Sequence, residues 1–381
     1  MSDRKIFEEV SKGAAQADSP TPGGIDRGHG GARKAIRAWL AVLFALVVAM
    51  IVVGGLTRLT DSGLSITDWR PVTGALPPMT EADWQAEFEK YKQIDQFHIM
   101  NKWMELSDFK QIYWWEWGHR QLGRVVGLVW ALGYLGFLAT RSIPKGWSLR
   151  LLLPGALGLL QGAIGFWMVH SGVTQGEGTT AVASYRLATH LGLAFIILGY
   201  LSWFIFLLGR QEGNLLQMRR LKEAKLFGLS TGLLHFAFLQ ILIGALVAGI
   251  DAGRSYTDWP LMGGQLLPPR PFMIEPIWKN LFENPGLVQF IHRVVGYVLF
   301  AFGIVVWLRG RRSAHAATRF AFNSVIAGLT LQVAIGIVTV LTAAPLLIAI
   351  VHQAGAVLVF VLILRARFLS AYPSTTSIKG H

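Results

Sequence analysis

Eight long apolar stretches interrupt this chain of 381 residues, and they constrain its fold more than any other feature. Each is long enough to cross the hydrocarbon core of a bilayer, which requires about 20 helical residues. Lipid offers no hydrogen-bond partner to the backbone, so segments of this length must be helical. The predicted spans lie near residues 36–57, 112–139, 149–170, 185–208, 226–250, 286–308, 319–342 and 345–368. The sequence therefore predicts an all-α integral membrane protein with eight transmembrane helices.

The composition agrees with a membrane protein and excludes several other classes. Hydrophobic residues make up 52% of the chain and charged residues 15%, against about 25% charged in an ordinary soluble domain. The chain has no cysteine, which excludes disulfides, thiolate metal sites and cysteine nucleophiles. Its net charge of +13 falls between the apolar segments. We therefore expect contact with the lipid bilayer and not with nucleic acid.

The charges of the connecting segments predict how the chain is oriented. Segments 141–150, 209–225 and 309–319 together carry 12 Lys/Arg and two Glu. The other long connections carry eight Lys/Arg and 14 Asp/Glu; they are 59–111, 171–184 and 251–285. By the positive-inside rule, the basic set and both termini lie on the cytoplasmic or matrix side. The long loops then face the periplasm or the intermembrane space.

Four motifs recur in the same order in both halves, which indicates an internal repeat. The segment DSGLSITDW at 61–69 matches DAGRSYTDW at 251–259 at six of nine positions. The other matches pair His119-Arg120 with His292-Arg293, Leu160–Gly165 with Leu331–Gly336, and His190 with His352. With four spans in each half, the repeats are parallel. The predicted fold is two pseudo-symmetric parallel four-helix bundles.

The spans and the repeat together define the predicted domains. They are a flexible cytoplasmic tail (1–35), an N-terminal bundle (36–208) that includes the long outer loop 59–111, a cytoplasmic linker (209–225), a C-terminal bundle (226–368) and a second cytoplasmic tail (369–381).

Four of the ten histidines are candidate ligands. They are His119, His190, His292 and His352, each near the outer start of an even-numbered span. Ionisable groups in a span usually have a specific partner, and paired imidazoles in an apolar bundle suit a metal or a haem iron. The alternative is polar packing between helices. Pairing within each bundle predicts two sites at similar depth, His119 with His190 and His292 with His352.

The neighbours of these histidines favour haem over a bare metal. A small residue follows each histidine by four positions, namely Gly123, Ala194, Gly296 and Ala356, and we expect it to leave room for a flat macrocycle. Arg120 and Arg293 directly follow their histidines, and haem propionates are suitable anions for them. The alternative for the arginines is contact with lipid phosphates.

An acidic residue distinguishes the first site from the second. Glu116 precedes His119 by three positions, so both side chains share one face of a helix that Ser107 is expected to cap. The matching residue before His292 is Gln289, which cannot ionise. Glu116 could act as a general base or offset developing positive charge. The alternative is an exposed glutamate at the membrane interface.

The first outer loop contains a predicted surface helix. Thr80 and Asp83 resemble a capping box, and Trp84, Phe88 and Tyr91 then recur at helical spacing. This helix could cover the first bundle, contact a partner or simply complete the loop.

At this point the ordered motifs resemble those of the haem A synthase family. The resemblance rests on Gly54–Ser65, Asp68-Trp69, Glu116–Arg120 with Gly123-Arg124, Thr189-His190, Ala248–Gly253, Asp258–Met262, Gln289–Arg293 and Val351–Gln353. It covers roughly residues 36–368. The absence of cysteine and the long first loop resemble the mitochondrial and alphaproteobacterial branch, whereas another branch carries a cysteine pair in an outer loop.

The resemblance implies an oxidoreductase that converts haem O to haem A by oxidising one porphyrin methyl group to a formyl group. Water would supply the oxygen, and electrons would leave to an acceptor. His292 and His352, with Arg293 and Gly296, would hold a resident haem B. His119 and His190, with Arg120 and Gly123, would bind haem O beside the catalytic Glu116.

The resemblance also implies a setting for this activity. The product would serve cytochrome aa3 oxidase assembly, with the haem O synthase and oxidase assembly factors as partners and a homo-oligomer as a further option. The membrane would be the bacterial or the mitochondrial inner membrane. Two mechanisms remain open: successive hydroxylation to a gem-diol that loses water, or electron abstraction followed by trapping of a cation by water.

Two other functional classes remain as alternatives. A two-haem electron-transfer cytochrome b would hold both haems permanently and leave them unchanged. A transporter built on the parallel repeat would need a polar path, for which Gln161 and Gln332 are the repeated candidates.

Overall fold

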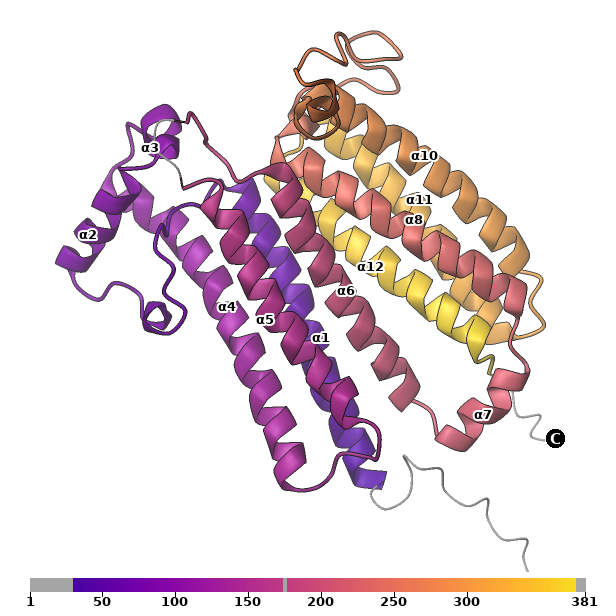
Figure 1. The fold of residues 1–381 in the computed structure, drawn as a ribbon. Coiled ribbons are helices and arrows are strands. Elements are labelled where there is room, and N and C mark those ends of the chain that lie inside the picture. Colours follow the sequence, from indigo (N-terminus) through magenta and orange to yellow (C-terminus); the bar gives the residue numbers. More distant parts are fainter. Residues whose placement is uncertain (1–29, 174–176, 375–381) are drawn as a thin grey trace, which may run out of the picture.

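The computed structural model of the chain describes residues 30–173 and 177–374. Among these residues the regular structure is helical, and eight helices are long and apolar enough to cross a membrane. They are α1 (Gly30–Leu59), α4 (Leu106–Ala139), α5 (Ser148–His170), α6 (Ser184–Leu208), α8 (Ala224–Gly249), α10 (Pro285–Gly310), α11 (Ala316–Leu341) and α12 (Leu346–Ala371). The predicted all-helical, multi-pass membrane fold is confirmed (Figure 1).

Several helix ends differ from the predicted spans because polar residues extend the helices beyond the apolar core. Helix α1 begins at Gly30, so residues 30–35 are helical and not part of a flexible tail. The rest of that predicted tail lies outside the described residues. Helix α4 begins at Leu106, and its N-cap is Glu105, which forms a capping box with Asp108. The prediction of Ser107 as the cap was wrong, because Ser107 already lies inside the helix.

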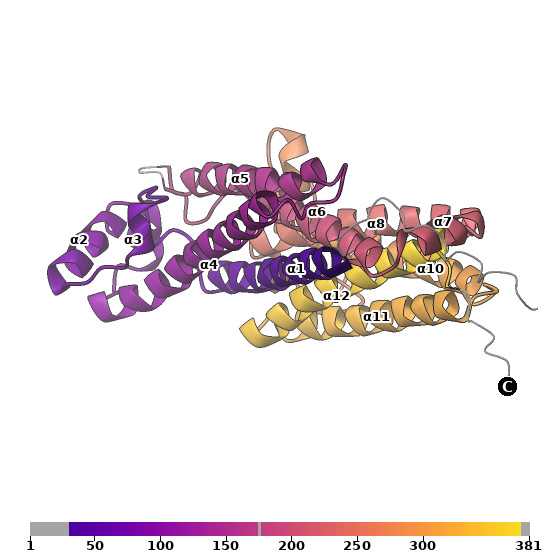
Figure 2. The same cartoon turned by 90° about the horizontal axis from the view of Figure 1, so that it is seen from below.

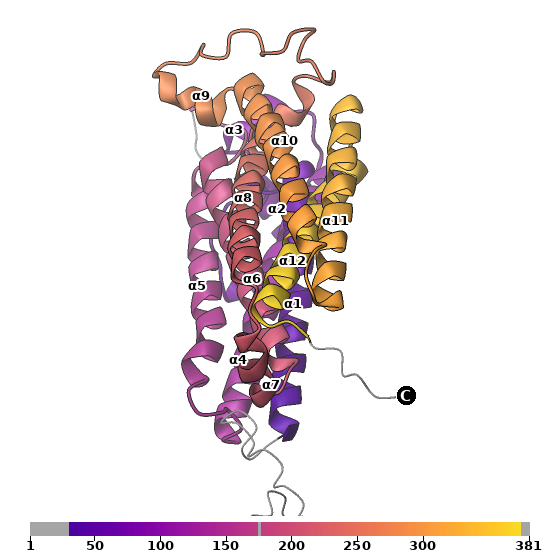
Figure 3. The same cartoon turned by 90° about the vertical axis from the view of Figure 1, so that its right-hand side faces the viewer.

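Short helices occupy the connections between the spans. The first outer loop contains η1 (Thr73–Ala75), α2 (Glu81–Tyr91) and α3 (Asp95–Met100). The later outer loop contains η2 (Ala252–Arg254), η3 (Ile277–Lys279) and α9 (Asn280–Glu283), and it extends over the outer end of α10 (Figure 3). The linker contains α7 (Glu212–Arg220), a helix that the hydropathy pattern did not indicate.

The four long helices of each half contact one another in a closed ring. In the first half, α4 contacts α1 and α5, and α6 contacts α5 and α1. In the second half, α10 contacts α8 and α11, and α12 contacts α11 and α8. Contacts between the halves involve α1 and α6 on one side and α8 and α12 on the other; α1, α6 and α12 meet near the middle of the molecule (Figure 2).

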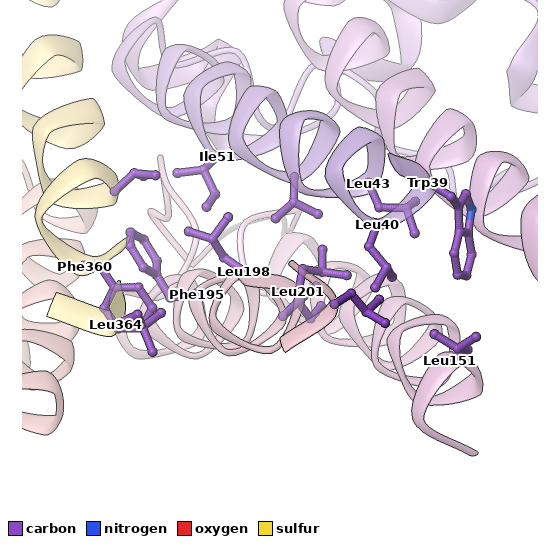
Figure 4. Packing of buried hydrophobic residues seen from close by; sticks show 14 of the residues in the cluster. Trp39, Leu40, Leu43, Ile51, Leu151, Phe195, Leu198, Leu201, Phe360 and Leu364 are labelled. Carbon is purple, nitrogen blue, oxygen red and sulfur yellow. The ribbon is translucent and has the colours of Figure 1, made fainter. Parts of the chain in front are cut away.

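The largest apolar cluster reaches from the first half into the second. Trp39, Leu40 and Leu43 of α1 pack with Leu198 of α6, and Phe360 of α12 joins them from the other half (Figure 4). The rings of Phe195 and Phe360 meet edge to face at 5.3 Å. This shared packing holds α1, α6 and α12 in fixed positions relative to one another.

The outer ends of the two halves are also joined by charge. Arg58, near the end of α1, lies 2.7 Å from Asp61 and 2.7 Å from Asp251. These two aspartates open the two copies of the repeated motif. Arg58 also donates to the carbonyl oxygen of Gly249. A single cation therefore connects both outer loops.

Helix α2 confirms the predicted capping box, and its apolar face packs on protein. The side chain of Thr80 accepts from the backbone of Asp83, and the carboxylate of Asp83 accepts from the backbone of Thr80. The apolar face, with Trp84, Phe88 and Tyr91, is buried against Phe109 and Tyr113 in the outer extension of α4. The helix therefore packs on protein, which fixes the first outer loop over α4.

Candidate functional site: four histidines and a buried glutamate

The four candidate histidines lie at comparable places on four long helices. His190, His292 and His352 come six or seven residues after the first residues of α6, α10 and α12. His119 comes thirteen residues into α4, whose first turns extend beyond the others to support α2. His119 and His190 pack against glycines of α1 and α5 in the first ring of helices, and His292 and His352 against glycines of α8 and α11 in the second. The spatial arrangement thus supports the predicted pairs.

Each imidazole ring packs against a glycine on a neighbouring helix. A Cβ atom added to Gly54 would lie 2.8 Å from Cε1 of His119, and one added to Gly165 would lie 3.0 Å from Cε1 of His190. In the second half, Gly244 and Gly336 have the same relation to their histidines, at 3.1 and 3.0 Å. A larger residue at Gly54 would displace the ring, and at the other three glycines the ring would have to shift by a few tenths of an ångström. These glycines therefore define the space in which each histidine is held.

Glutamine side chains bond to three of the four histidines. Gln161, Gln240 and Gln332 each lie four residues before one of these glycines. Their Nε2 atoms donate to the backbone oxygens of His190, His292 and His352 at 2.8–2.9 Å. The same atoms lie 3.1–3.3 Å from the Nδ1 atoms of the three rings. Gln161 and Gln332 therefore bond to histidines, which argues against a transport path through them.

His119 is the exception among the four. The residue four positions before Gly54 is Met50, which has no amide group. The Nδ1 atom of His119 is buried without a hydrogen-bond partner. Met50 fills the space beside Gly123, where an added Cβ atom would lie 3.1 Å from its Cε atom. Gln240 fills the space beside Gly296, where an added Cβ atom would lie 3.2 Å from its Nε2 atom. A role for Gly123 and Gly296 beside a macrocycle stays a prediction.

Glu116 is buried, with 3% of its surface exposed, which overturns the alternative of an exposed interfacial glutamate. Its Oε2 atom accepts from the hydroxyl of Ser65 at 2.8 Å and from the backbone N–H of Ile66 at 2.7 Å. Its Oε1 atom pairs with the guanidinium of Arg120. Three donors therefore surround the carboxylate, which suits a charged acid held in one position.

Gln289 donates a hydrogen bond to the second outer loop, whereas Glu116 accepts hydrogen bonds from the first. Its Nε2 atom donates to the backbone oxygen of Tyr256 at 3.0 Å, whereas its Oε1 atom is buried without a partner. Tyr256 occupies the place in the repeated motif that Ile66 occupies in the first copy. The first loop thus offers donors to a carboxylate, and the second offers an acceptor to an amide.

The two arginines that follow the histidines bond to the repeated motif. Arg120 donates to the backbone oxygens of Asp68 and Ile66, at 2.9 and 2.6 Å. Arg293 donates to those of Asp258, Leu261 and Tyr256, at 2.9–3.0 Å. The anion beside Arg120 is therefore Glu116 of its own helix. Contact of either arginine with a haem propionate stays a prediction.

Two cavities border Arg120 at the outer end of the first half. The larger, of about 350 Å³, lies between the loop around Asp68, helix α2 and helix α4, and Lys90 and Arg124 also line it. The smaller, of about 60 Å³, lies on the side of Phe166. Both linings include Arg120 but not His119, His190 or Glu116.

The aspartates of the repeat stabilise loops. Asp258 accepts from the backbone N–H groups of Gly263 and Gly264, both at 2.9 Å, and these bonds hold the pKa of its carboxyl below the usual range. A hydrogen bond from Lys90, 3.0 Å away, together with the charges of Lys90 and Arg70, lowers the pKa of Asp68. Both groups are therefore fixed in their loops, whose carbonyls anchor the two arginines.

The donor set fits haem better than a bare metal ion. Among the residues that the structure describes, no group of three or more His, Asp or Glu side chains could hold a metal. Two imidazoles on facing helices, each beside a glycine, are a donor set that haem iron uses. The Nδ1 atom of His119 and the Oε1 atoms of the three glutamines are buried without hydrogen-bond partners. The residues present therefore fit haem at both pairs.

The fold and these side chains define a class: an all-helical, multi-pass membrane protein with two pairs of histidines. The model of a family described as cytochrome oxidase assembly protein matches residues 37–364. Proteins named heme A synthase are similar over essentially the full length of both chains. The protein of Ruegeria sp. (strain TM1040) is 81% identical to this chain over 381 residues, and that of Ruegeria pomeroyi is 74% identical over 379. The protein of Paracoccus denitrificans is 60% identical over 380 residues. Each comparison covers 99–100% of both chains. The chain belongs to the haem A synthase family.

Some residues of the site were missed from the sequence. Ser65 and the backbone of Ile66 act through a loop whose path spacing cannot reveal. The four glycines and Gln240 did leave a signal, because Gln or Met followed by Gly four residues later recurs in four spans, at 50–54, 161–165, 240–244 and 332–336. Only the second and fourth of these were recognised as a match.

Proposed function

We propose that this chain is a haem A synthase: an oxidoreductase that oxidises one methyl group of haem O to a formyl group and releases haem A. Water supplies the oxygen atom, and the electrons pass to an acceptor. The family membership and the full-length similarity to proteins named heme A synthase support this activity.

The two histidine pairs have different roles in this proposal. His119 and His190, with Arg120 and Gly123, bind the substrate haem in the first half. His292 and His352, with Arg293 and Gly296, hold a resident haem B in the second half. When bound, haem B supplies a site that can accept electrons one at a time from the neighbouring reaction. The glutamines beside both of its histidines support the assignment of the second pair to the resident group.

The observation that carries the proposal is the difference between Glu116 and Gln289. Glu116 is an acid beside one histidine pair only, and it is held by Ser65, Ile66 and Arg120. A fixed carboxylate can take a proton from an attacking water or stabilise positive charge on the substrate. Gln289 can do neither. An electron carrier with two permanent haems would not need this difference.

The proposal also covers the arrangement of the chain and its surroundings. Residues 36–208 form the substrate bundle and 226–368 the resident-haem bundle, an assignment that the repeated ring of helix contacts supports. The chain lies in the bacterial inner membrane with both termini on the cytoplasmic side and its long loops in the periplasm. Its product serves cytochrome aa3 oxidase, and the haem O synthase and oxidase assembly factors are its partners.

The test is the haem inventory of the detergent-purified protein, produced together with a haem O synthase. The haems are extracted with acid and separated by chromatography with mass detection. Haem B together with haem O and its oxidised products, including haem A, is the expected result. Two haem B per chain, with haem O supplied but not bound or converted, would contradict the proposal and favour the electron carrier.

A further inference from the structure

Four equivalent positions precede the histidine-facing glycines, and one of them differs. Three hold the glutamines that bond to His190, His292 and His352. The fourth holds Met50, whose Cε lies against Gly123, one turn beyond His119 on α4. Met50 belongs to the site of His119 and His190, which we assign to the substrate. The equivalent residue in the repeat is Gln240, which belongs to the site of His292 and His352, assigned to the resident haem. The substrate site must release its product, whereas the resident site must not.

Glutamine at this position can fix a ligand imidazole. A histidine that binds iron through Nε2 carries its proton on Nδ1, and an acceptor for that proton orients the ring and strengthens the bond to the metal. The Oε1 atoms of Gln161, Gln240 and Gln332 are buried without partners. As the structure stands, the amide Nε2 donates to the histidine's backbone oxygen and lies 3.1–3.3 Å from Nδ1; that of Gln240 also lies 3.3 Å from the ring Nε2 of His292, so it packs against the ring. Oε1 reaches an Nδ1–H only if the amide turns and gives up this backbone bond, an exchange that iron bound at the ring Nε2 would favour.

Methionine cannot do the same for His119. Its thioether is at best a weak acceptor, and the Nδ1 atom of His119 has no other partner. Loss of such an outer partner typically weakens metal binding 10–100-fold. Met50 has nearly the length of glutamine, and it packs on Gly123 as Gln240 packs on Gly296. The two sites therefore differ here in hydrogen bonding while the packing is the same.

We propose that Met50 makes His119 a weakly held ligand, so that the first site exchanges its haem, and that Gln240 keeps the haem of the second site resident. This inference rests on the proposed function for the direction of exchange. The structural difference itself concerns ligand strength and does not depend on which haem is bound.

The experiment transfers haem from the purified, haem-loaded protein to an excess of apomyoglobin and follows each haem type by chromatography. Met50→Gln should slow the loss of haem O and haem A about tenfold or more and leave the loss of haem B unchanged. Gln240→Met should accelerate the loss of haem B by a similar factor. Met50→Leu, which lacks an amide, is the control and should release its haem as the original protein does.

A second readout separates positioning from a change in packing. A stronger imidazole ligand stabilises ferric iron, so Met50→Gln should lower the midpoint potential of the first-site haem, and Met50→Leu should not. Unchanged release and unchanged potential in Met50→Gln, with haem O and haem A bound as expected, would overturn the inference alone. If the protein holds two haem B instead, the proposed function fails. The rate of the faster phase of haem B transfer then tests the inference. A slower rate in Met50→Gln than in the original protein supports it, and an equal rate overturns it.

Discussion

The hydroxyl of Ser65 donates a 2.8 Å hydrogen bond to the carboxylate of Glu116, so the first repeated loop directly holds the one acid that the second half lacks. The same oxygen accepts from Ile66 N–H, and Arg120 pairs with the other oxygen. This arrangement links the first repeated loop to a side chain of helix α4. It gives the first histidine pair a property that its partner does not share.

Glu116→Gln should preserve haem binding and stop turnover. The amide has nearly the same shape, but it cannot take a proton or carry negative charge, and loss of a general base typically costs at least about 100-fold in rate. The measurement is haem A formation beside total haem content. Near-normal haem A formation in a fully loaded variant would remove Glu116 from the mechanism.

Ser65→Ala should reduce haem A formation by about tenfold to 100-fold, because a hydrogen bond to a charged group contributes about 1.5–3 kcal/mol and each 1.4 kcal/mol is a factor of ten. Ser255 occupies the equivalent position in the second copy of the motif, and in that half Gln289 stands where the first half has Glu116. Ser255→Ala is therefore the matched control and should keep its activity. Equal loss in both variants would show that the effect comes from loop folding and not from Glu116.

Gly54→Ala should empty the first site of haem. The added methyl group would lie 2.8 Å from His119 Cε1, so the ring must move. Alanine is otherwise favourable in a helix relative to glycine, by about 0.5–1 kcal/mol. Gly162→Ala, where a Cβ would meet nothing within 4 Å, is the control. Haem O and haem A should disappear from the first variant and remain in the second, with haem B present in both; full retention in Gly54→Ala would contradict the packing described for His119.

Acid should loosen the second outer loop through Asp258. The folded-state pKa of this carboxyl is lowered by the N–H groups of Gly263 and Gly264, so its stabilising effect is present above the ordinary aspartate value of 3.8 and is lost as the pH falls through the lower folded value. Hydrogen exchange of the Gly263 and Gly264 amides should therefore gain protection as the pH rises through this range. Asp258→Asn should lack that pH dependence; an identical profile in the variant would assign it to another group.

Much of the architecture could be predicted from the sequence because lipid imposes simple requirements. The spans are read from hydropathy, and the pairing of His119 with His190 follows from the order of the repeats. The predicted helix ends were less accurate: Glu105 and not Ser107 caps α4, because the helix continues beyond its apolar stretch to support α2. Hydropathy detects only the part of such a helix that lies in lipid.

The details of the site depend on contacts that spacing cannot show. The anion of Arg120 is Glu116, and the partners of Arg293 are loop carbonyls, because the outer loops fold back over the helix starts. A sequence indicates that an arginine in a span needs a partner, but several groups can satisfy it. The histidine-facing glycines were obscured for a related reason: glycine is common in membrane helices, and only the fold shows which ones face a ring.

The most direct test of the division between the two sites compares the haem contents of His119→Ala and His292→Ala, each produced with a haem O synthase and quantified by haem type. The account predicts that His119→Ala retains haem B and loses haem O and haem A, whereas His292→Ala loses haem B. A full complement of haem B in His292→Ala, or its loss in His119→Ala with haem O retained, would contradict the assignment of the resident haem to the second half.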